Sequence, residues 1–249
     1  MLPTSKTEWR LLAEPPNLGQ GEIHVWRIQL DRSEADAVRL KDCLSAEEHD
    51  RVASLRFIQD RKRFVIRRAI LRHLLGSYLD LTARNVRLFS ATNKKPFIDG
   101  QNGPSSIHFT CSHSADWGLI AVARNRELGV DIECHGTLTN VNQLAEICLS
   151  RNEIIEFSKF AEDAKTKCFF DAWTCKEAFV KAIGTGLSYP LKEITVSMQT
   201  NQPVKILKVE NHVRAGERWK LISLDVKPDF SAALVYENRK TTLKFFEWI

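Results

Sequence analysis

The second half of this 249-residue sequence repeats the order of features found in the first half. A Ser-x-x-Glu pattern, typical of a capping box at a helix start, begins at Ser45 and again at Ser150, 105 residues later (150 − 45). Each pattern precedes a long helical stretch that reaches a glycine, Gly76 or Gly184, 108 residues apart (184 − 76). Because the offset is nearly constant, the sequence predicts two similar α/β halves rather than a repeat array.

Hydrophobic periodicity places further elements in each half. Helices are expected over 61–75 and 169–183, and strands over 22–30, 86–89, 107–111, 119–123, 130–133, 193–198, 204–209, 219–224 and 231–236. The sequence therefore predicts an α/β (α+β) chain with halves 1–126 and 127–249, each a small, mostly antiparallel sheet packed against one long helix. A cleft between two such halves is a common place for a ligand.

Composition favours a soluble protein of the cytosol. Apolar residues make up 43% and charged residues 27% of the sequence, which is ordinary for a globular chain. Six scattered cysteines without a CxxC pair predict free thiols in a reducing compartment. The first residues do not resemble a signal peptide, and the longest apolar run, 119–123, is far too short to cross a bilayer. We therefore expect a cytoplasmic protein without a membrane partner.

Positive charge is concentrated in one predicted helix. The net charge is +5, and six bases crowd twelve residues, namely Arg61, Lys62, Arg63, Arg67, Arg68 and Arg72. Such a cluster can serve nucleic acid, a polyphosphate ligand or an acidic protein. A solvated helix face is the plainer interpretation, although only Asp60 lies nearby to balance the charge.

Two acids share one face of a predicted strand at 129–133. In an extended chain Val130 and Ile132 point into a core, while Asp131 and Glu133 stand on the opposite face with Cα atoms about 7 Å apart. Like charges at this distance repel, and a cation between them would relieve the repulsion. Paired carboxylates suit Mg²⁺ or Ca²⁺. Two solvated acids at an exposed strand end remain the alternative.

Charged residues also interrupt the apolar face of the helix predicted over 169–183. Lys176 falls inside that face and Glu177 at its edge, and Lys181 follows Glu177 by one turn. A buried charge without a partner is costly. These charged residues therefore form either an ion pair that supports packing or part of a ligand-binding site.

Five segments, taken in order, resemble the motifs of a known family. They are Lys95-Pro96, FTCSHS at 109–114, GVDIE at 129–133, WTCKEA at 173–178 and KAIGTGL at 181–187. Together they resemble the 4′-phosphopantetheinyl transferase superfamily, in its larger, surfactin-synthetase-activating class. The resemblance spans about residues 44–190 and implies two halves related by a pseudo-two-fold axis. Three positions differ from the usual pattern: Lys94 where Gly is frequent, Thr110 where Asn is common, and Glu48 where some members have a base.

The resemblance implies a reaction between coenzyme A and a carrier protein. A serine of an apo acyl or peptidyl carrier attacks the phosphorus nearer the pantetheine, the 4′-phosphopantetheine arm moves to that serine, and 3′,5′-ADP leaves. Mg²⁺ would be held by Asp131, Glu133 and Glu177, and Glu177 would deprotonate the serine, directly or through a metal-bound water. Lys176 and Lys181 would hold phosphate oxygens. Such chemistry depends on positioning and charge neutralisation.

The same resemblance assigns the coenzyme nucleotide largely to the N-terminal half. The implied contacts are Arg63, Lys95, Pro96, Ser112 and His113, with Arg51 as a weaker candidate. The carrier is expected to be acidic and to dock near the basic helix, and the chain to be a monomer. Fatty acid, polyketide and nonribosomal peptide carriers all remain open.

Two other functions fit the sequence less well. Ser112-His113 could indicate a serine hydrolase, but adjacent strand residues point apart and no GxSxG elbow occurs. The stronger rival is a non-catalytic, two-lobed basic module that binds nucleic acid or an acidic protein. It explains the basic cluster but gives no role to Asp131, Glu133 and Glu177, which would repel a phosphate backbone. We therefore expect no nucleic acid partner.

Overall fold

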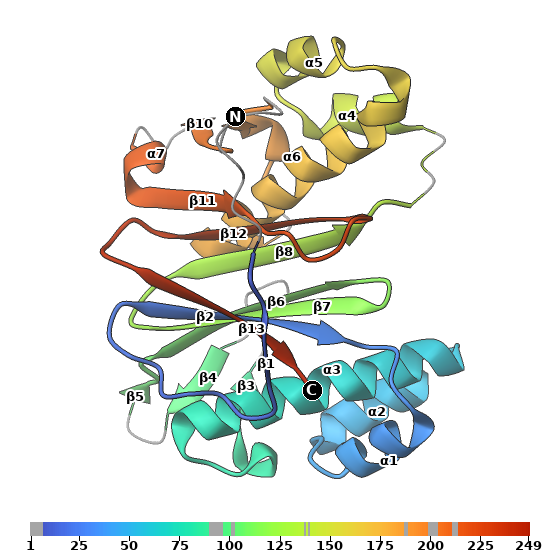
Figure 1. Cartoon of the computed structure of the whole chain (residues 1–249), viewed down its shortest axis with the longest axis vertical. Coiled ribbons are helices and arrows are strands. Elements are labelled where there is room, and N and C mark those ends of the chain that lie inside the picture. Colours follow the sequence, from blue (N-terminus) through green and yellow to red (C-terminus); the bar gives the residue numbers. More distant parts are fainter. Residues whose placement is uncertain are drawn as a thin grey trace.

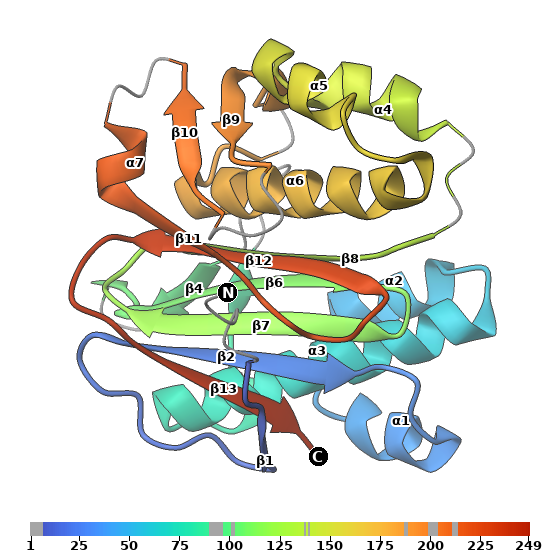
Figure 2. The ribbon, with the colours of Figure 1, turned by 45° about the horizontal axis from the view of Figure 1, so that its top comes forward.

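Two sheets lie face to face between two groups of helices. The computed structural model describes residues 7–89, 97–100, 103–136, 138, 140–186, 189–198, 204–210 and 214–249. In Figures 1 and 2 the order of layers, from bottom to top, is helices, first sheet, second sheet, helices. The predicted mixed α/β fold is confirmed. Among the described residues no helix is long and apolar enough to cross a membrane, and the six cysteines are free thiols, as expected.

The first sheet has five strands. Their spatial order is β1 (Arg10–Leu12), β13 (Thr242–Trp248), β2 (Glu22–Gln29), β7 (Trp117–Arg124) and β6 (Ile107–Ser114). Helices α1 (Glu34–Lys41), α2 (Ala46–Ser54) and α3 (Ile58–Leu79) cover its lower face. Strands β2, β7 and β6 are antiparallel neighbours, whereas β13 runs parallel to both β1 and β2. Strand β6 therefore forms an edge of the sheet.

Strand β13 departs from the expected division of the chain. The prediction assigned everything after residue 126 to the C-terminal half, yet the last strand pairs with β2 in the first sheet. Phe246 and Trp248 are buried in the core beneath that sheet, together with Trp26. Strand β13 thus crosses the predicted division at 126/127, because its apolar face is buried against the N-terminal helices.

The second sheet has three antiparallel strands and its own helices. The strands are β11 (Trp219–Ser223), β12 (Phe230–Glu237) and β8 (Leu128–Cys134), in that order. Above them lie α4 (Val141–Cys148), α5 (Arg151–Phe157), α6 (Glu162–Ile183), the pair β9 (Ile194–Val196) and β10 (Ile206–Val209), and α7 (Ala215–Arg218). Short elements complete the fold: β3 (Leu88–Phe89), β4 (Phe97–Gly100), β5 (Gly103–Pro104), and 3-10 turns at Ala83–Asn85 and Leu191–Glu193.

A separate apolar core joins the two sheets. Val25 and Leu119 of the first sheet meet Val130, Ile132 and Leu234 of the second. The alternation predicted for 129–133 is therefore confirmed, because Val130 and Ile132 are fully buried in this core. Asp131, which lies between them, must therefore face the other way, toward α6.

Helix starts repeat as predicted, but one predicted helix end is wrong. Ser45 and Ser150 each cap a helix in a complete capping box with Glu48 or Glu153. The two long helices both have 22 residues. Gly184 ends α6 in the left-handed conformation, with φ 72°.

Gly76, in contrast, lies inside α3, which continues to Leu79 and ends at Asp80 with φ 56°. A Cβ on Gly76 would lie 2.6 Å from the carbonyl oxygen of Leu81. The glycine therefore serves the close return of the chain rather than the helix end.

Candidate active site

Helix α6 lies almost on the backbone of β8 because Gly129 has no side chain. A Cβ at this position would lie 2.0 Å from the carbonyl oxygen of Ala178 and 2.4 Å from the nitrogen of Ala182. Glu177 directly precedes Ala178, and Lys181 directly precedes Ala182. Both are thereby held beside Asp131, the next outward-facing residue of the strand. The motif glycine thus has a packing role.

Asp131 is the centre of a buried polar cluster. It is 3% exposed. Its Oδ1 accepts hydrogen bonds from Ser112 Oγ at 2.7 Å and from Lys181 Nζ at 2.7 Å. The same ammonium lies 2.9 Å from Ser112 Oγ, which closes a three-membered network. The other oxygen, Oδ2, is buried and has no hydrogen-bond partner among the described residues, which is unusual for a buried carboxylate.

Hydroxyl groups of β6 attach that edge strand to β8. Thr110 Oγ1 accepts from the backbone N–H of Val130 at 3.3 Å. Ser114 Oγ donates to Glu133 Oε2 at 2.8 Å and accepts from the N–H of Cys134 at 3.1 Å. Every second residue of β6 from Thr110 to Ser114 therefore contacts β8, and the two sheets meet at the acids.

Three carboxylates share this space. Burial raises the pKa of Glu133, and the negative charge of Asp131 adds to the effect, although hydrogen bonds from Ser114 and Trp173 oppose it. Burial also raises the pKa of Glu177, followed by the charges of Asp131 and Glu133, with Lys181 acting in the other direction. The structure thus brings together the three acids predicted from the sequence, with more negative charge than one ammonium balances.

The acids do not form a ready-made metal centre. Within the described ranges no group of three His, Cys, Asp or Glu side chains is arranged to hold an ion. The ammonium of Lys181 lies at Asp131 Oδ1 instead. The orphaned Oδ2 and the repulsion among the acids nevertheless fit a cation that would add to this one positive charge.

Basic side chains gather around His113. Burial lowers the pKa of its imidazole to about 4, and the positive charges of Arg67, Lys181 and Arg63 contribute further. Arg63 itself pairs with Asp31 through two hydrogen bonds, Nε to Oδ1 at 2.7 Å and Nη2 to Oδ2 at 2.8 Å. An imidazole surrounded by cations is a natural place for a phosphate.

Lys176 does not lie in this cluster, which corrects its expected role at a phosphate. Its side chain is fully buried. Its ammonium donates to Glu153 Oε2 at 2.5 Å and to the carbonyl oxygens of Cys148 at 2.9 Å and Leu191 at 3.1 Å. All three N–H groups are therefore used inside the protein. Lys176 thus forms an ion pair that supports packing, but its partner is Glu153 of another helix rather than a neighbouring charge of its own helix.

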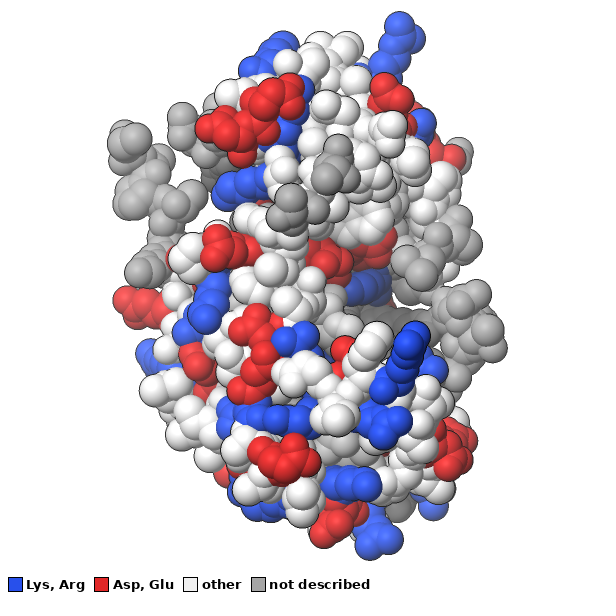
Figure 3. Space-filling view, turned by 90° about the vertical axis from the view of Figure 1, so that its right-hand side faces the viewer, with Lys and Arg blue, Asp and Glu red and all other residues white. Residues whose placement is uncertain are grey.

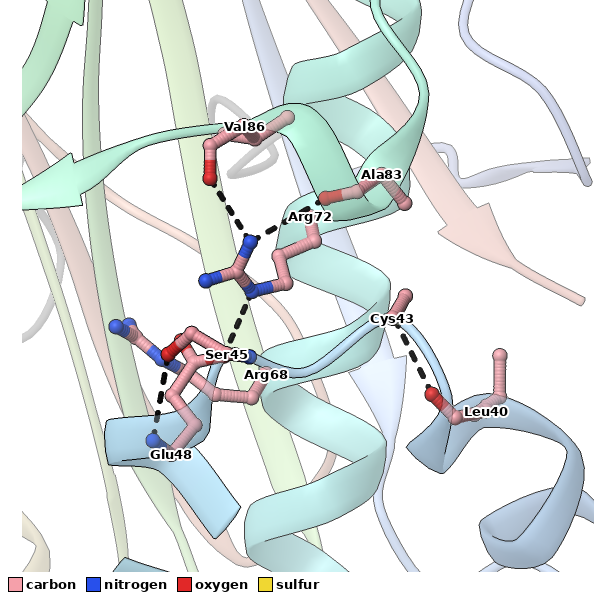
Figure 4. Close-up of polar contacts among 8 residues, drawn as sticks. All are labelled: Leu40, Cys43, Ser45, Glu48, Arg68, Arg72, Ala83 and Val86. Atoms are coloured by element: carbon pink, nitrogen blue, oxygen red, sulfur yellow. Dashed lines mark hydrogen bonds and ion pairs between the residues drawn. The ribbon is translucent and has the colours of Figure 1, made fainter.

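The N-terminal half contains a matching arrangement. Glu48 of the first capping box accepts from Arg68 Nε at 2.6 Å and from Arg72 Nε at 2.7 Å (Figure 4). Arg72 also donates to the carbonyl oxygens of Ala83 and Val86. Each capping glutamate thus binds a base from the long helix of its own half. The carboxylate of Glu48 is therefore paired with bases of its own half.

The remaining predicted contacts are less informative. Lys95 and Pro96 lie outside the described residues. Arg51 is exposed on α2, and its guanidinium has no hydrogen-bond or ion-pair partner among the described residues. The sequence-based prediction gave no role to Ser114, although its spacing from Ser112 equals that of Glu133 from Asp131. It likewise gave no separate role to Trp173 or Arg67.

Charges of both signs meet at the junction of the two halves. Figure 3 shows acidic atoms and basic atoms side by side in a recess at that height, with more basic atoms scattered over the lower half. Carboxylates that favour a cation thus lie beside bases that favour anions. This arrangement suits a ligand that brings both a divalent ion and phosphate groups.

Known proteins with similar sequences share one activity in their names. A 4′-phosphopantetheinyl transferase N-terminal model matches residues 29–125, and the 4′-phosphopantetheinyl transferase superfamily model matches residues 127–235. The 4′-phosphopantetheinyl transferase HetI of Nostoc is 33% identical, covering 95% of this chain and 98% of that protein. The Bacillus subtilis 4′-phosphopantetheinyl transferase ffp is 26% identical over 84% of this chain and 94% of its own length.

One solved structure is a holo-(acyl-carrier-protein) synthase from Bacillus anthracis in complex with CoA (3′,5′-ADP), at 20% identity, covering 45% of this chain and 94% of that chain with a TM-score of 0.38. The family models and the nearly full-length relative confirm the expected family. The chain belongs to the 4′-phosphopantetheinyl transferase superfamily, in its larger class.

Proposed function

We propose that this enzyme transfers the 4′-phosphopantetheine arm of coenzyme A to a serine of an apo carrier protein and releases 3′,5′-ADP. The observation that carries the proposal is the buried cluster in which Asp131, Ser112 and Lys181 meet beside Glu133 and Glu177. Transfer from a diphosphate requires charge neutralisation and a group that accepts the serine proton. This cluster offers both.

We further propose that Asp131, Glu133 and Glu177 hold Mg²⁺. The orphaned Oδ2 of Asp131 and the raised pKa values of Glu133 and Glu177 are the observations that support this assignment. Mg²⁺ usually takes one or two carboxylates together with phosphate oxygens and water. Bound here, it would neutralise negative charge on the diphosphate.

The chain's own groups have distinct roles in this proposal. Glu177 accepts the proton of the attacking serine, directly or through a water, because its raised pKa makes it a better base than an ordinary carboxylate. Lys181 places an ammonium where phosphate oxygens arrive, and Ser112 and Asp131 hold that ammonium in position. Arg63 and His113 would bind the nucleotide end.

The carrier is expected to be acidic and to approach over the basic lower half. Association between oppositely charged surfaces raises the encounter rate and depends on ionic strength. We also expect a monomer in the cytoplasm, with fatty acid, polyketide or nonribosomal peptide carriers as candidate substrates.

Incubation with coenzyme A, Mg²⁺ and a panel of apo carriers tests the proposal. The product carrier should gain the mass of one phosphopantetheine arm, measured by intact-protein mass spectrometry. Asp131→Ala and Glu177→Ala should abolish transfer while the circular dichroism spectrum stays that of the wild type. Near-normal turnover in either variant would remove that residue from the proposed metal site. Arg63→Ala and His113→Ala should mainly raise the KM for coenzyme A.

Direct titrations separate this proposal from the rival basic module. Coenzyme A should bind with a strength that depends on Mg²⁺, as measured by isothermal titration calorimetry. A duplex oligonucleotide in place of the coenzyme should give no comparable heat at physiological salt. Tight, salt-sensitive duplex binding without coenzyme binding would support the module instead.

A further inference from the structure

The six bases crowded on α3 differ in what they bind. Arg61 donates to the carbonyl oxygen of Leu55, and Lys62 lies 3.8 Å from Glu34. Arg63 pairs with Asp31, and Arg68 and Arg72 both pair with Glu48. Five of the six therefore have an oxygen partner inside the protein, and most of this cluster is structural.

Arg67 is the exception. Its guanidinium lies over the ring of Phe64, 5.3 Å from the centroid. Among the described residues it has no hydrogen-bond or ion-pair partner. The residue is only partly exposed, and burial lowers its pKa. A guanidinium with five donors, partly withdrawn from water and without an acceptor, is costly unless a ligand supplies the anion.

The strand alternation of β6 places His113 on the face of the first sheet that α3 covers. Ser112 and Ser114 point toward the acids of β8. Cys111 and His113 therefore lie on the other side, where Cys111 packs against the core beneath the sheet. The positive charge of Arg67 contributes to lowering the pKa of His113, ahead of the charges of Lys181 and Arg63. Arg67 thus lies within electrostatic reach of the imidazole.

We propose that Arg67 is a phosphate-binding residue of this enzyme, whose free guanidinium donates to a phosphate group of coenzyme A beside His113. The assignment rests on the proposed function, since it requires coenzyme A as the ligand. It does not follow from the family motifs quoted above, which contain no counterpart of Arg67. Arg63, already committed to Asp31, has less to offer an incoming phosphate than Arg67.

The variant Arg67→Gln should separate binding from folding. Charge-assisted hydrogen bonds to a phosphate are strong enough that their loss should weaken coenzyme A binding by about ten- to a hundredfold. No oxygen among the described residues loses a partner, so the thermal midpoint should stay unchanged or rise. A purely structural arginine would give the opposite pattern, with a lower midpoint and unchanged affinity in the folded protein.

Three further variants and ligands sharpen the experiment. Arg61→Gln removes the same charge from the same helix and should leave affinity within about twofold of the wild type, because exposed charges contribute weakly. Arg67→Lys keeps the charge and should recover part of the loss. The coenzyme lacking its 3′-phosphate distinguishes the two phosphate sources. The penalty of Arg67→Gln should disappear with that analogue if the 3′-phosphate is the partner, and persist if the diphosphate is.

Affinity is measured by calorimetry without carrier, and the KM for coenzyme A by the transfer assay. Unchanged affinity in Arg67→Gln, or an equal loss in Arg61→Gln, would overturn the assignment. If the wild type binds coenzyme A but transfers nothing, the proposed reaction fails while the binding role of Arg67 is still tested. If the wild type binds no coenzyme A at all, both proposals fall.

Discussion

Replacing Gly129 with alanine should damage the active site through packing alone. The new Cβ would lie 2.0 Å from the carbonyl oxygen of Ala178, whereas ordinary contacts begin at 3.4 Å. Helix α6 and strand β8 must therefore separate by about 1.4 Å (3.4 − 2.0). A displacement of this size breaks the 2.7 Å contact between Lys181 and Asp131.

The expected cost has two parts. Overpacking of a core typically costs ~1–3 kcal/mol, which corresponds to a fall of roughly 2–12 °C in the thermal midpoint of a chain of this size. A misplacement of about 1 Å can cost a hundredfold in rate. We therefore expect Gly129→Ala to fold, to melt earlier, and to transfer the arm about a hundredfold more slowly.

Gly118→Ala is the matched control for this experiment. Gly118 also lies in a strand, β7, which is the neighbour of β6 in the first sheet, but a Cβ there would meet its nearest atom at 3.5 Å, an ordinary contact. Its thermal midpoint and transfer rate should match those of the wild type. If Gly129→Ala kept the thermal midpoint and the transfer rate of the wild type, the close packing of α6 on β8 could not be what positions Glu177 and Lys181.

Three other predictions follow from charges. The raised pKa of Glu177 means that the folded protein keeps this proton to a higher pH than the unfolded chain, so stability falls as pH rises above the ordinary value of 4.5. Without Mg²⁺, Glu177→Gln should therefore melt a few degrees higher than the wild type at pH 8, with the difference shrinking toward pH 4.5; a lower midpoint at pH 8 would contradict this. Lys176→Met leaves the buried Glu153 without its ion-pair partner and should lower the free energy of unfolding by ~3–5 kcal/mol without changing the KM for coenzyme A. Its control, Lys159→Met, breaks an exposed pair and should be nearly neutral. A stable Lys176→Met protein that binds coenzyme A weakly would show that Lys176 belongs to the site. Carrier modification should slow as salt is added, and a rate independent of ionic strength would count against docking on the basic half.

Local interactions are what the sequence by itself determined. The capping boxes at Ser45 and Ser150 depend on residues three apart, and the alternation of Asp131 and Glu133 with Val130 and Ile132 on residues two apart. Both were readable because backbone geometry sets these spacings. The end of α6 at Gly184 has the same local origin.

Contacts between distant segments were decided by tertiary structure. Lys176 was misassigned because its partner, Glu153, is 23 residues away, and nothing in the helix pattern distinguishes a buried pair from a ligand contact. The sequence also predicts a helix end at Gly76, because the segment that returns against this glycine is not visible in the local pattern. Strand β13, near the C-terminal end of the sequence, pairs with β2, near its N-terminal end, and so belongs to the first sheet.

The active-site acids show the same difference between local pattern and tertiary packing. Sequence supplied the candidates Asp131, Glu133 and Glu177, because carboxylates at these spacings are recognisable on their own. Only the fold placed Lys181 on Asp131, left Oδ2 without a partner, and left Arg67 as the base on α3 without an acceptor among the described residues. Residue type and short spacing fix which groups are present, whereas burial and long-range packing fix which of them are left to bind a ligand.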